Sequence, residues 1–111
     1  MTVKELAKKQ IFELVHIGDD PEADISKLFC CDLLSVAMGK APAGGCWVTV
    51  MANMNTLAVA ALTETACIVL AEGMTLDENC VQKAIQQGIT VFCTELPVFE
   101  AALRVHELIH A

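Results

Sequence analysis

Short apolar segments alternate with helix-forming segments along the second half of this chain, and this alternation limits the folds open to it. The apolar segments are rich in Val and Ile and are bounded by glycine or polar residues, which is typical of buried strands. Strands are expected at residues 47–51, 66–70 and 89–93, and helices at 57–63, 75–88 and 97–110. Because a helix follows each strand, the pattern predicts an α/β fold with a mostly parallel sheet flanked by helices.

The first half predicts two strands between two short helices. The expected elements are a helix to about residue 9, strands at 11–17 and 25–31 around a turn at 18–21, and a helix at 33–38. Thr2 and Glu5 have the spacing of a capping box, which favours a helix start at the N-terminus. Asp32 is expected to cap the second helix, and Gly39 is expected to end it.

Polar residues also predict where two later helices begin. Asn55 or Thr56 should mark the start of the helix at 57–63. Thr75 and Glu78 again have the spacing of a capping box, and Gly88 lies where the following helix would close.

One continuous run suggests a family. From Asp32 to Leu62 the chain reads Asp-Leu-Leu-Ser, a Gly-Lys-Ala-Pro-Ala-Gly-Gly loop, Trp-Val-Thr-Val-Met, Ala-Asn-Met-Asn and Thr-Leu-Ala-Val-Ala-Ala-Leu. This run resembles the DRTGG domain family, which is seen at the N-terminus of HPr kinase/phosphorylase and in some phosphotransacetylases and CBS-domain pyrophosphatases. The resemblance implies an HPr kinase N-terminal-domain-like fold, a single domain over residues 1–111, and a regulatory accessory role.

The family's name motif is altered in this chain. Where the family has a Gly-Asp-Arg-Thr-like string, this sequence has Ala-Asn-Met-Asn-Thr at 52–56 and therefore lacks the arginine. The surrounding sequence resembles the stand-alone, single-domain branch of the family, which also carries Asn before an Ala-Val-Ala helix.

The composition points to self-association. Hydrophobic residues make up 55% of the chain, and the mean hydropathy is +0.54, which is more apolar side chain than a small monomer can hide. No apolar stretch reaches the roughly 20 residues that a membrane-spanning helix needs. We therefore expect a cytoplasmic homodimer without membrane contact, and the interface is expected to include Phe99 and Leu103.

Charge and cysteine usage exclude other classes. The net charge is −7, the seven basic residues are scattered, and the chain has no Tyr and one Trp, so no nucleic-acid partner is expected. The six cysteines include no Cys-x-x-Cys pair and are interpreted as reduced thiols, with Cys67 and Cys93 inside expected strands. No cofactor is expected.

A ligand site is expected where the parallel strands end. Ligands of open α/β sheets bind beyond the carboxyl ends of the strands, where helix-start amides favour polar or anionic groups. This rule selects Asp32, Ser35, Asn53, Asn55, Gly73 and Thr94 as candidate ligand-binding residues, beside Glu72 and Glu95. The ligand is expected to be a small polar or anionic metabolite, although Asp32, Asn55 and Thr94 have an alternative role as helix caps.

No complete catalytic constellation is present. Gly39-Lys40 lacks the other residues of a phosphate-binding loop. His106, Glu107 and His110 spell H-E-x-x-H, which can ligate zinc, but the motif needs a third ligand and a cleft. Because the histidines continue a helical stripe with Phe99 and Leu103, a partner-contacting surface is the preferred interpretation.

Two functions follow from these observations. The first is a non-catalytic regulatory or small-ligand-sensing domain that acts as a homodimer and can also bind a partner protein. The alternative is a metal- or thiol-dependent protein, either a small hydrolase or a redox sensor, that uses His106, His110 and the cysteines.

Overall fold

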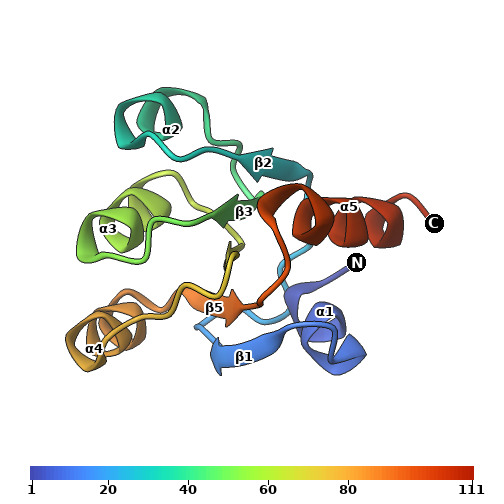
Figure 1. Cartoon of the computed structure of the whole chain (residues 1–111), viewed down its shortest axis with the longest axis horizontal. Helices are drawn as coiled ribbons and strands as arrows, with labels where there is room; N and C mark the ends of the chain where they lie inside the picture. Colours follow the sequence, from blue (N-terminus) through green and yellow to red (C-terminus); the bar gives the residue numbers. More distant parts are fainter.

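The computed structural model describes residues 1–111 and contains five helices and five strands (Figure 1). In chain order these are α1 (Val3–Lys9), β1 (Glu13–His16), β2 (Leu28–Cys30), α2 (Leu34–Lys40), β3 (Cys46–Thr49), α3 (Met54–Leu62), β4 (Cys67–Leu70), α4 (Glu78–Gln87), β5 (Thr90–Cys93) and α5 (Val98–Ile109). Every expected helix and strand is present, with ends that differ by a few residues.

The strands form one sheet in the order β1-β5-β4-β3-β2. Strands β2 to β5 are parallel to their neighbours, and β1 pairs antiparallel with β5. This arrangement confirms the expected α/β class with a mostly parallel sheet. No helix lies between β1 and β2, so the segment that joins them runs from one margin of the sheet to the other.

Helices cover both faces of the sheet, with α1 and α5 on one side and α2, α3 and α4 on the other (Figure 1). Because side chains alternate along a strand, each strand supplies both cores. Cys46 and Val48 pack toward α1 and α5, whereas Trp47, between them, packs toward the other three helices. All of β3, β4 and β5 is buried, which explains why their sequences are apolar except for Thr49 at the end of β3 and Thr90 at the start of β5.

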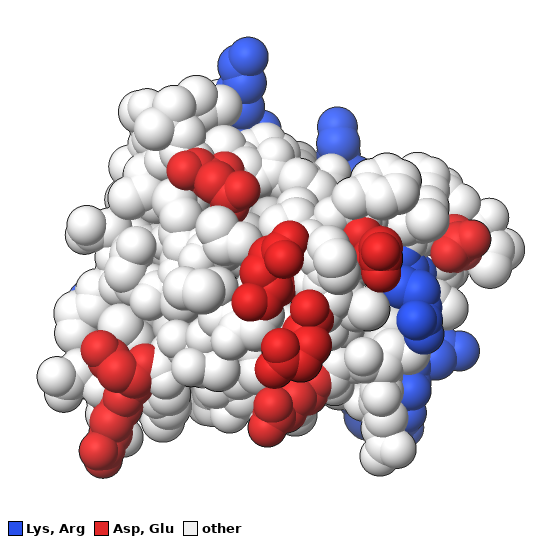
Figure 2. All heavy atoms as spheres, viewed as in Figure 1, with Lys and Arg blue, Asp and Glu red and all other residues white.

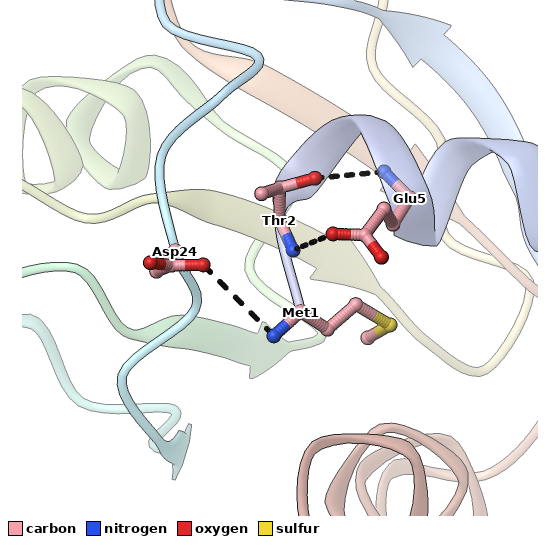
Figure 3. Close-up of polar contacts among 4 residues, drawn as sticks. All are labelled: Met1, Thr2, Glu5 and Asp24. Carbon is pink, nitrogen blue, oxygen red and sulfur yellow. Dashed lines mark hydrogen bonds and ion pairs between the residues drawn. The ribbon is translucent and has the colours of Figure 1, made fainter.

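The first helix begins as the sequence predicts. The Thr2 hydroxyl accepts from the Glu5 N–H, and the Glu5 carboxylate accepts from the Thr2 N–H, both at 3.1 Å (Figure 3). These hydrogen bonds lower the pKa of Glu5. The Met1 amino group lies 4.0 Å from Asp24 and ties the N-terminus to the β1–β2 connection (Figure 3).

Two other helix starts differ from expectation. Helix α3 begins earlier than predicted because Asn53, rather than Asn55 or Thr56, is its cap. The side-chain oxygen Oδ1 of Asn53 accepts from the Thr56 N–H at 3.0 Å. Helix α4 is capped by Asp77, whose carboxylate accepts from the Cys80 N–H at 2.8 Å, so the expected Thr75–Glu78 box does not form. In both cases a nearby Asn or Asp side chain accepts the hydrogen bond at the helix start in place of the predicted residue.

Helix α2 also corrects two expectations. Its cap position is Leu33, which has no side-chain hydrogen bond, because the Asp32 carboxylate is turned toward β3 instead. Gly39 lies inside the helix, which continues to Lys40. Gly88, by contrast, closes α4 with φ +67°, a left-handed conformation that suits glycine.

Candidate functional site

The carboxyl ends of the four parallel strands lie along one edge of the sheet, and the antiparallel β1 adds its amino end to the same edge. Glu13, the first residue of β1, pairs with Cys93, the last residue of β5. Glu13 therefore adds a carboxylate to this edge, although β1 precedes all four parallel strands in the sequence.

A pocket of about 330 Å³ opens at this edge, over the ends of β4 and β5. Its lining comes from β1, the β4–α4 loop, and the end of β5 with the loop after it: Glu13, Gly73, Met74, Thr75, Cys93, Thr94 and Glu95. Two carboxylates and two threonines in this set supply polar groups to the pocket. A cavity of this size can hold a small metabolite.

A tight turn after β4 builds one wall of the pocket. Glu72 has φ +59° and Gly73 has φ +75°, so the chain reverses sharply after Ala71. The Gly73 N–H donates to the Thr94 carbonyl at 3.0 Å. The Glu72 carboxylate accepts from the Val98 N–H at 3.1 Å and so caps α5. The two loops that flank the pocket are thereby held together by hydrogen bonds.

Position 73 favours glycine. A Cβ atom there would lie 2.6 Å from a carboxylate oxygen of Glu95, and φ is in the left-handed region. The Glu95 side chain therefore lies directly over the Gly73 backbone, at the mouth of the pocket.

The pocket carries negative charge. Figure 2 shows acidic side chains along the middle of the face viewed, over β1, β5 and the segment that leads into α5, with Lys and Arg side chains toward its margins. No lysine or arginine lines the pocket. This arrangement opposes a bare phosphate group and favours a ligand with hydrogen-bond donors or positive charge.

The thiol of Cys93 lies at the base of this charged region. Its Sγ donates to a Glu13 carboxylate oxygen at 3.3 Å, and only 6% of the residue is exposed. Burial, followed by the hydrogen bond and charge of Glu13, raises the pKa of Cys93 to about 11. The thiol is therefore neutral at physiological pH and a poor nucleophile.

The other half of the edge, at the ends of β2 and β3, contains no pocket. Asp32 accepts from the Thr49 hydroxyl at 2.7 Å and from the Val50 N–H at 3.0 Å. Asn53 is occupied as the cap of α3. Ser35 and Asn55 are exposed on the first turns of α2 and α3. Of the six candidate ligand residues, Gly73 and Thr94 line the pocket, and these four lie at the same edge outside it.

Sequence reasoning missed several residues of the pocket. Glu13, Met74, Thr75 and Cys93 were not among the candidates, whereas the strand-end rule did select Glu95, which lines the pocket. Met74 and Thr75 follow Gly73 directly, so the turn after β4 was a usable signal. Glu13 gives no such signal, because its place depends on the antiparallel pairing of β1.

The H-E-x-x-H segment forms the last turns of α5. The rings of His106 and His110 lie with centroids 4.2 Å apart, and both residues are exposed. No group of three or more His, Cys, Asp or Glu side chains is arranged to hold a metal ion. The structure thus brings no third ligand to the two histidines.

The six cysteines are free thiols, and four of them are buried. Cys67 and Cys93 lie in β4 and β5 as expected. Cys46 and Cys67 are partners in the β3–β4 register, and a hydrogen bond with Cys67, together with burial, raises the pKa of Cys46 well above its ordinary value. Such thiols behave as small core side chains.

Two further hollows lie away from this edge. One of about 340 Å³ is at the opposite, amino edge of the sheet, and includes Asp20, Glu64 and Thr90 in its wall. The other, of about 230 Å³, is an apolar groove formed by Leu28, Phe99, Ala102, Leu103 and His106. Phe99 is 72% exposed and Leu103 is 40% exposed beside this groove.

Comparison with known proteins supports the fold. No protein-family model and no curated protein sequence matches the chain. A crystal structure of the CBS and DRTGG domains of the regulatory region of Clostridium perfringens pyrophosphatase, complexed with the activator diadenosine tetraphosphate, matches with a TM-score of 0.75 and 14% identity, over 92% of this chain and 44% of that chain. This likeness confirms the expected DRTGG-like α/β fold.

The similar structure is a regulatory region, and this chain spans under half of its length. None of the helices in this chain is long and apolar enough to cross a membrane.

Proposed function

We propose that this chain is a non-catalytic, ligand-sensing regulatory domain, and that it senses its ligand at the pocket between β1, β5 and the turn after β4. The observation that carries the proposal is the pocket itself, since it lies where sheets of this class bind ligands. The likeness to a nucleotide-activated regulatory region supports the regulatory role.

The charge of the pocket defines the class of ligand. Glu13 and Glu95 line it, and the Glu72 carboxylate lies on the neighbouring turn. A polyphosphate would bring further negative charge to these groups without a basic side chain to neutralise it. The proposed ligand is therefore a small polar molecule that donates hydrogen bonds, with an amine as the best match, rather than an anionic nucleotide.

Asp32, Ser35, Asn53 and Asn55 form the outer margin of the proposed site. Only a ligand longer than the pocket would reach along the edge to these residues. The amides of Asn53 and Asn55 and the hydroxyl of Ser35 can both donate and accept hydrogen bonds. One oxygen of the Asp32 carboxylate already accepts from Thr49 and Val50.

The proposed domain acts as a homodimer. Eleven large hydrophobic side chains are exposed in the single chain, among them Leu33, Leu62 and Phe99 at more than half of their full exposure. These exposed side chains support association with another chain.

An NMR titration of the ¹⁵N-labelled chain with the diamine putrescine tests the ligand site. We expect shifts of the Gly73, Thr75, Thr94 and Glu95 amides, and no comparable shifts on titration with diadenosine tetraphosphate. The shifts should weaken in Glu95→Gln and persist in Glu100→Gln, a matched change on α5 outside the pocket. Shifts that cluster at the amino edge, or a response of these amides to the tetraphosphate alone, would contradict the proposed site.

A further inference from the structure

The hollow of about 340 Å³ at the amino edge of the sheet is built where the β1–β2 connection crosses the starts of the parallel strands. Its walls come from this connection and from the loops that lead into β3, β4 and β5. The Asp19 N–H donates to the Gly88 carbonyl at 3.0 Å, and the Ser26 N–H donates to the Gly44 carbonyl at 2.8 Å. These hydrogen bonds fix the connection to the loops on either side of the hollow.

A buried hydroxyl in the wall of this hollow has an unused proton. Thr90, the first residue of β5, is 2% exposed, and its hydroxyl accepts from the Gly18 N–H at 2.8 Å. This is the one hydrogen bond that the Thr90 side chain forms, so no acceptor of the chain receives its O–H proton. A buried donor without an acceptor costs free energy. The hollow therefore presents a donor that an acceptor atom of a ligand would satisfy.

The second hydroxyl in the wall has the opposite polarity. The Thr63 hydroxyl donates to the Val59 carbonyl at 2.8 Å, which uses its single proton. In the hydrogen bond of 3.0 Å between the hydroxyls of Thr63 and Thr65, Thr65 is therefore the donor. Thr65 offers only lone pairs to the hollow, and Thr90 is the one side-chain donor among the residues that line it.

The mouth of the hollow attracts positive charge. The carboxylates of Asp20 and Glu64 line it, both residues are exposed, and neither forms an ion pair within the chain. Helices α3 and α4 end at this edge, and neither has a basic residue in its last turn. A helix C-terminus carries a partial negative charge. Since no lysine or arginine lines the hollow, this negative charge has no partner in the wall.

We propose that the amino-edge hollow is a second ligand site, and that it binds a small amino alcohol. The ammonium group of the ligand lies between the carboxylates of Asp20 and Glu64, and its hydroxyl oxygen accepts from the Thr90 hydroxyl. A bare metal ion has no acceptor for the Thr90 proton, and an anion would face two carboxylates without a basic partner. The amino alcohol is the class of ligand that matches both ends of the hollow.

This site is separate from the pocket of the proposed function. The two hollows lie at opposite edges of the sheet and share no residue. Putrescine has two ammonium groups and no acceptor, so it should bind the amino-edge hollow no better than a simple alkylamine does. The putrescine titration therefore tests the carboxyl-edge pocket, and failure of either site leaves the other standing.

An NMR titration of the ¹⁵N-labelled chain with two matched amines tests the second site. Ethanolamine carries the required hydroxyl, and propylamine has a methyl group in its place. We expect ethanolamine to shift the amides of Asp20, Gly44, Thr65 and Gly88, with a Kd about tenfold lower than that of propylamine, the ratio that one neutral hydrogen bond provides.

Substitutions at the two ends of the hollow separate the hydrogen bond from the charge. Thr90→Ser keeps the hydroxyl and should retain the preference for ethanolamine, whereas Thr90→Val should abolish it. Glu64→Gln should weaken the binding of both amines and leave their ratio unchanged. Glu107→Gln, a matched change on α5 away from the hollow, should alter neither.

Several outcomes would overturn the second site. Equal affinities for the two amines in the unchanged chain would show that Thr90 is not a ligand donor. A preference that survives in Thr90→Val, undiminished binding in Glu64→Gln, or ethanolamine shifts confined to the carboxyl edge would each do the same. If Thr90→Val fails to fold, because it also removes the acceptor of the Gly18 N–H, the two amines on the unchanged chain and on Glu64→Gln still decide.

Discussion

The two halves of the carboxyl edge differ in what their polar side chains do. In one half these side chains form hydrogen bonds within the chain, and in the other they line a pocket. At the ends of β2 and β3, Asp32 and Asn53 direct their oxygens into hydrogen bonds with Thr49, Val50 and Thr56. At the ends of β4 and β5, the Glu95 carboxylate lies over glycine, and a pocket of about 330 Å³ opens beneath it. One half is closed by its own side chains, and the other remains open to a ligand.

This difference shows that topology alone does not make a binding site. Parallel strands leave a crevice at their carboxyl ends, but a short polar side chain that follows a strand can fill it by bonding to the next strand. The turn at Glu72 and Gly73 avoids this outcome, because the Glu72 carboxylate is drawn away to cap α5. The open half is thus kept free by the same hydrogen bond that positions a helix.

The largest effect is expected from Asp32→Ala, which tests whether the closed half is structural. The Thr49 hydroxyl is fully buried and would lose its acceptor, as would the Val50 N–H. Hydrogen bonds to a charged acceptor contribute about 1.5–3 kcal/mol, so the free energy of unfolding should fall by about 2–3 kcal/mol. Urea denaturation measures this change, with the exposed Asp20→Ala as control. A loss no larger than that of the control would mean that the closed half does not depend on Asp32.

Gly73→Ala should produce the next largest effect, and in the open half. A side chain at φ +75° costs about 1–2 kcal/mol, and the new Cβ would displace the Glu95 carboxylate. We expect a loss of stability of this size in urea denaturation, together with weaker putrescine shifts at Thr94. Gly39→Ala, at a helical position where a Cβ meets nothing, is the matched control and should be neutral or stabilising.

Asn53→Ala and Asn55→Ala should differ in their loss of stability, because Asn53 caps α3 and Asn55 is an exposed residue of the same helix. Asn53 accepts from the Thr56 N–H and caps α3, so its loss should cost about 1 kcal/mol. Asn55 forms no side-chain hydrogen bond and is exposed, so its loss should cost under about 0.5 kcal/mol. Thermal unfolding of the two variants in parallel provides the comparison. Equal losses would show that Asn53 does not act as the cap.

At neutral pH the smallest effect comes from the titration of Cys93 in the open half, because this effect appears only at alkaline pH. Burial and Glu13 raise the pKa of Cys93 from 9.0 to about 11 in the folded chain. The stabilisation is therefore complete below pH 9 and is lost as the pH rises toward 11, because the unfolded chain ionises first. The melting temperature should fall across this range.

Cys93→Ser removes this titrating group and should make the fall in melting temperature shallower. It should not abolish it, because burial also raises the pKa of Cys80. An identical pH profile for the variant and the unchanged chain would show that Cys93 titrates normally.

The local signals in the sequence located most elements and misplaced several of their starts. The apolar runs that became β3, β4 and β5 and the capping box of Thr2 and Glu5 depend on neighbours within a few residues, and all were predicted. The caps of α2, α3 and α4 were assigned wrongly because several short polar residues stand near each start. Which of them bonds to the helix depends on competition with partners elsewhere, as Asp32 shows by bonding to Thr49 of the next strand.

The sequence predicted which edge of the sheet carries the candidate site, but not where along that edge the pocket lies. Gly73 and Thr94 followed from the rule that ligands bind beyond strand ends, and both line the pocket. Glu13 could not be found in this way, since 80 residues separate it from Cys93 and only the antiparallel pairing of β1 brings them together.

The sequence by itself determined the class of fold, because strand and helix periodicities are local properties and their alternation permits few arrangements. It also located the end of each parallel strand to within two residues. Only the tertiary structure decided which of these residues keep free polar groups, since this depends on hydrogen bonds between distant segments. The order of the strands likewise came from long-range pairing, which placed a regular β2 at one margin and an irregular β1 at the other.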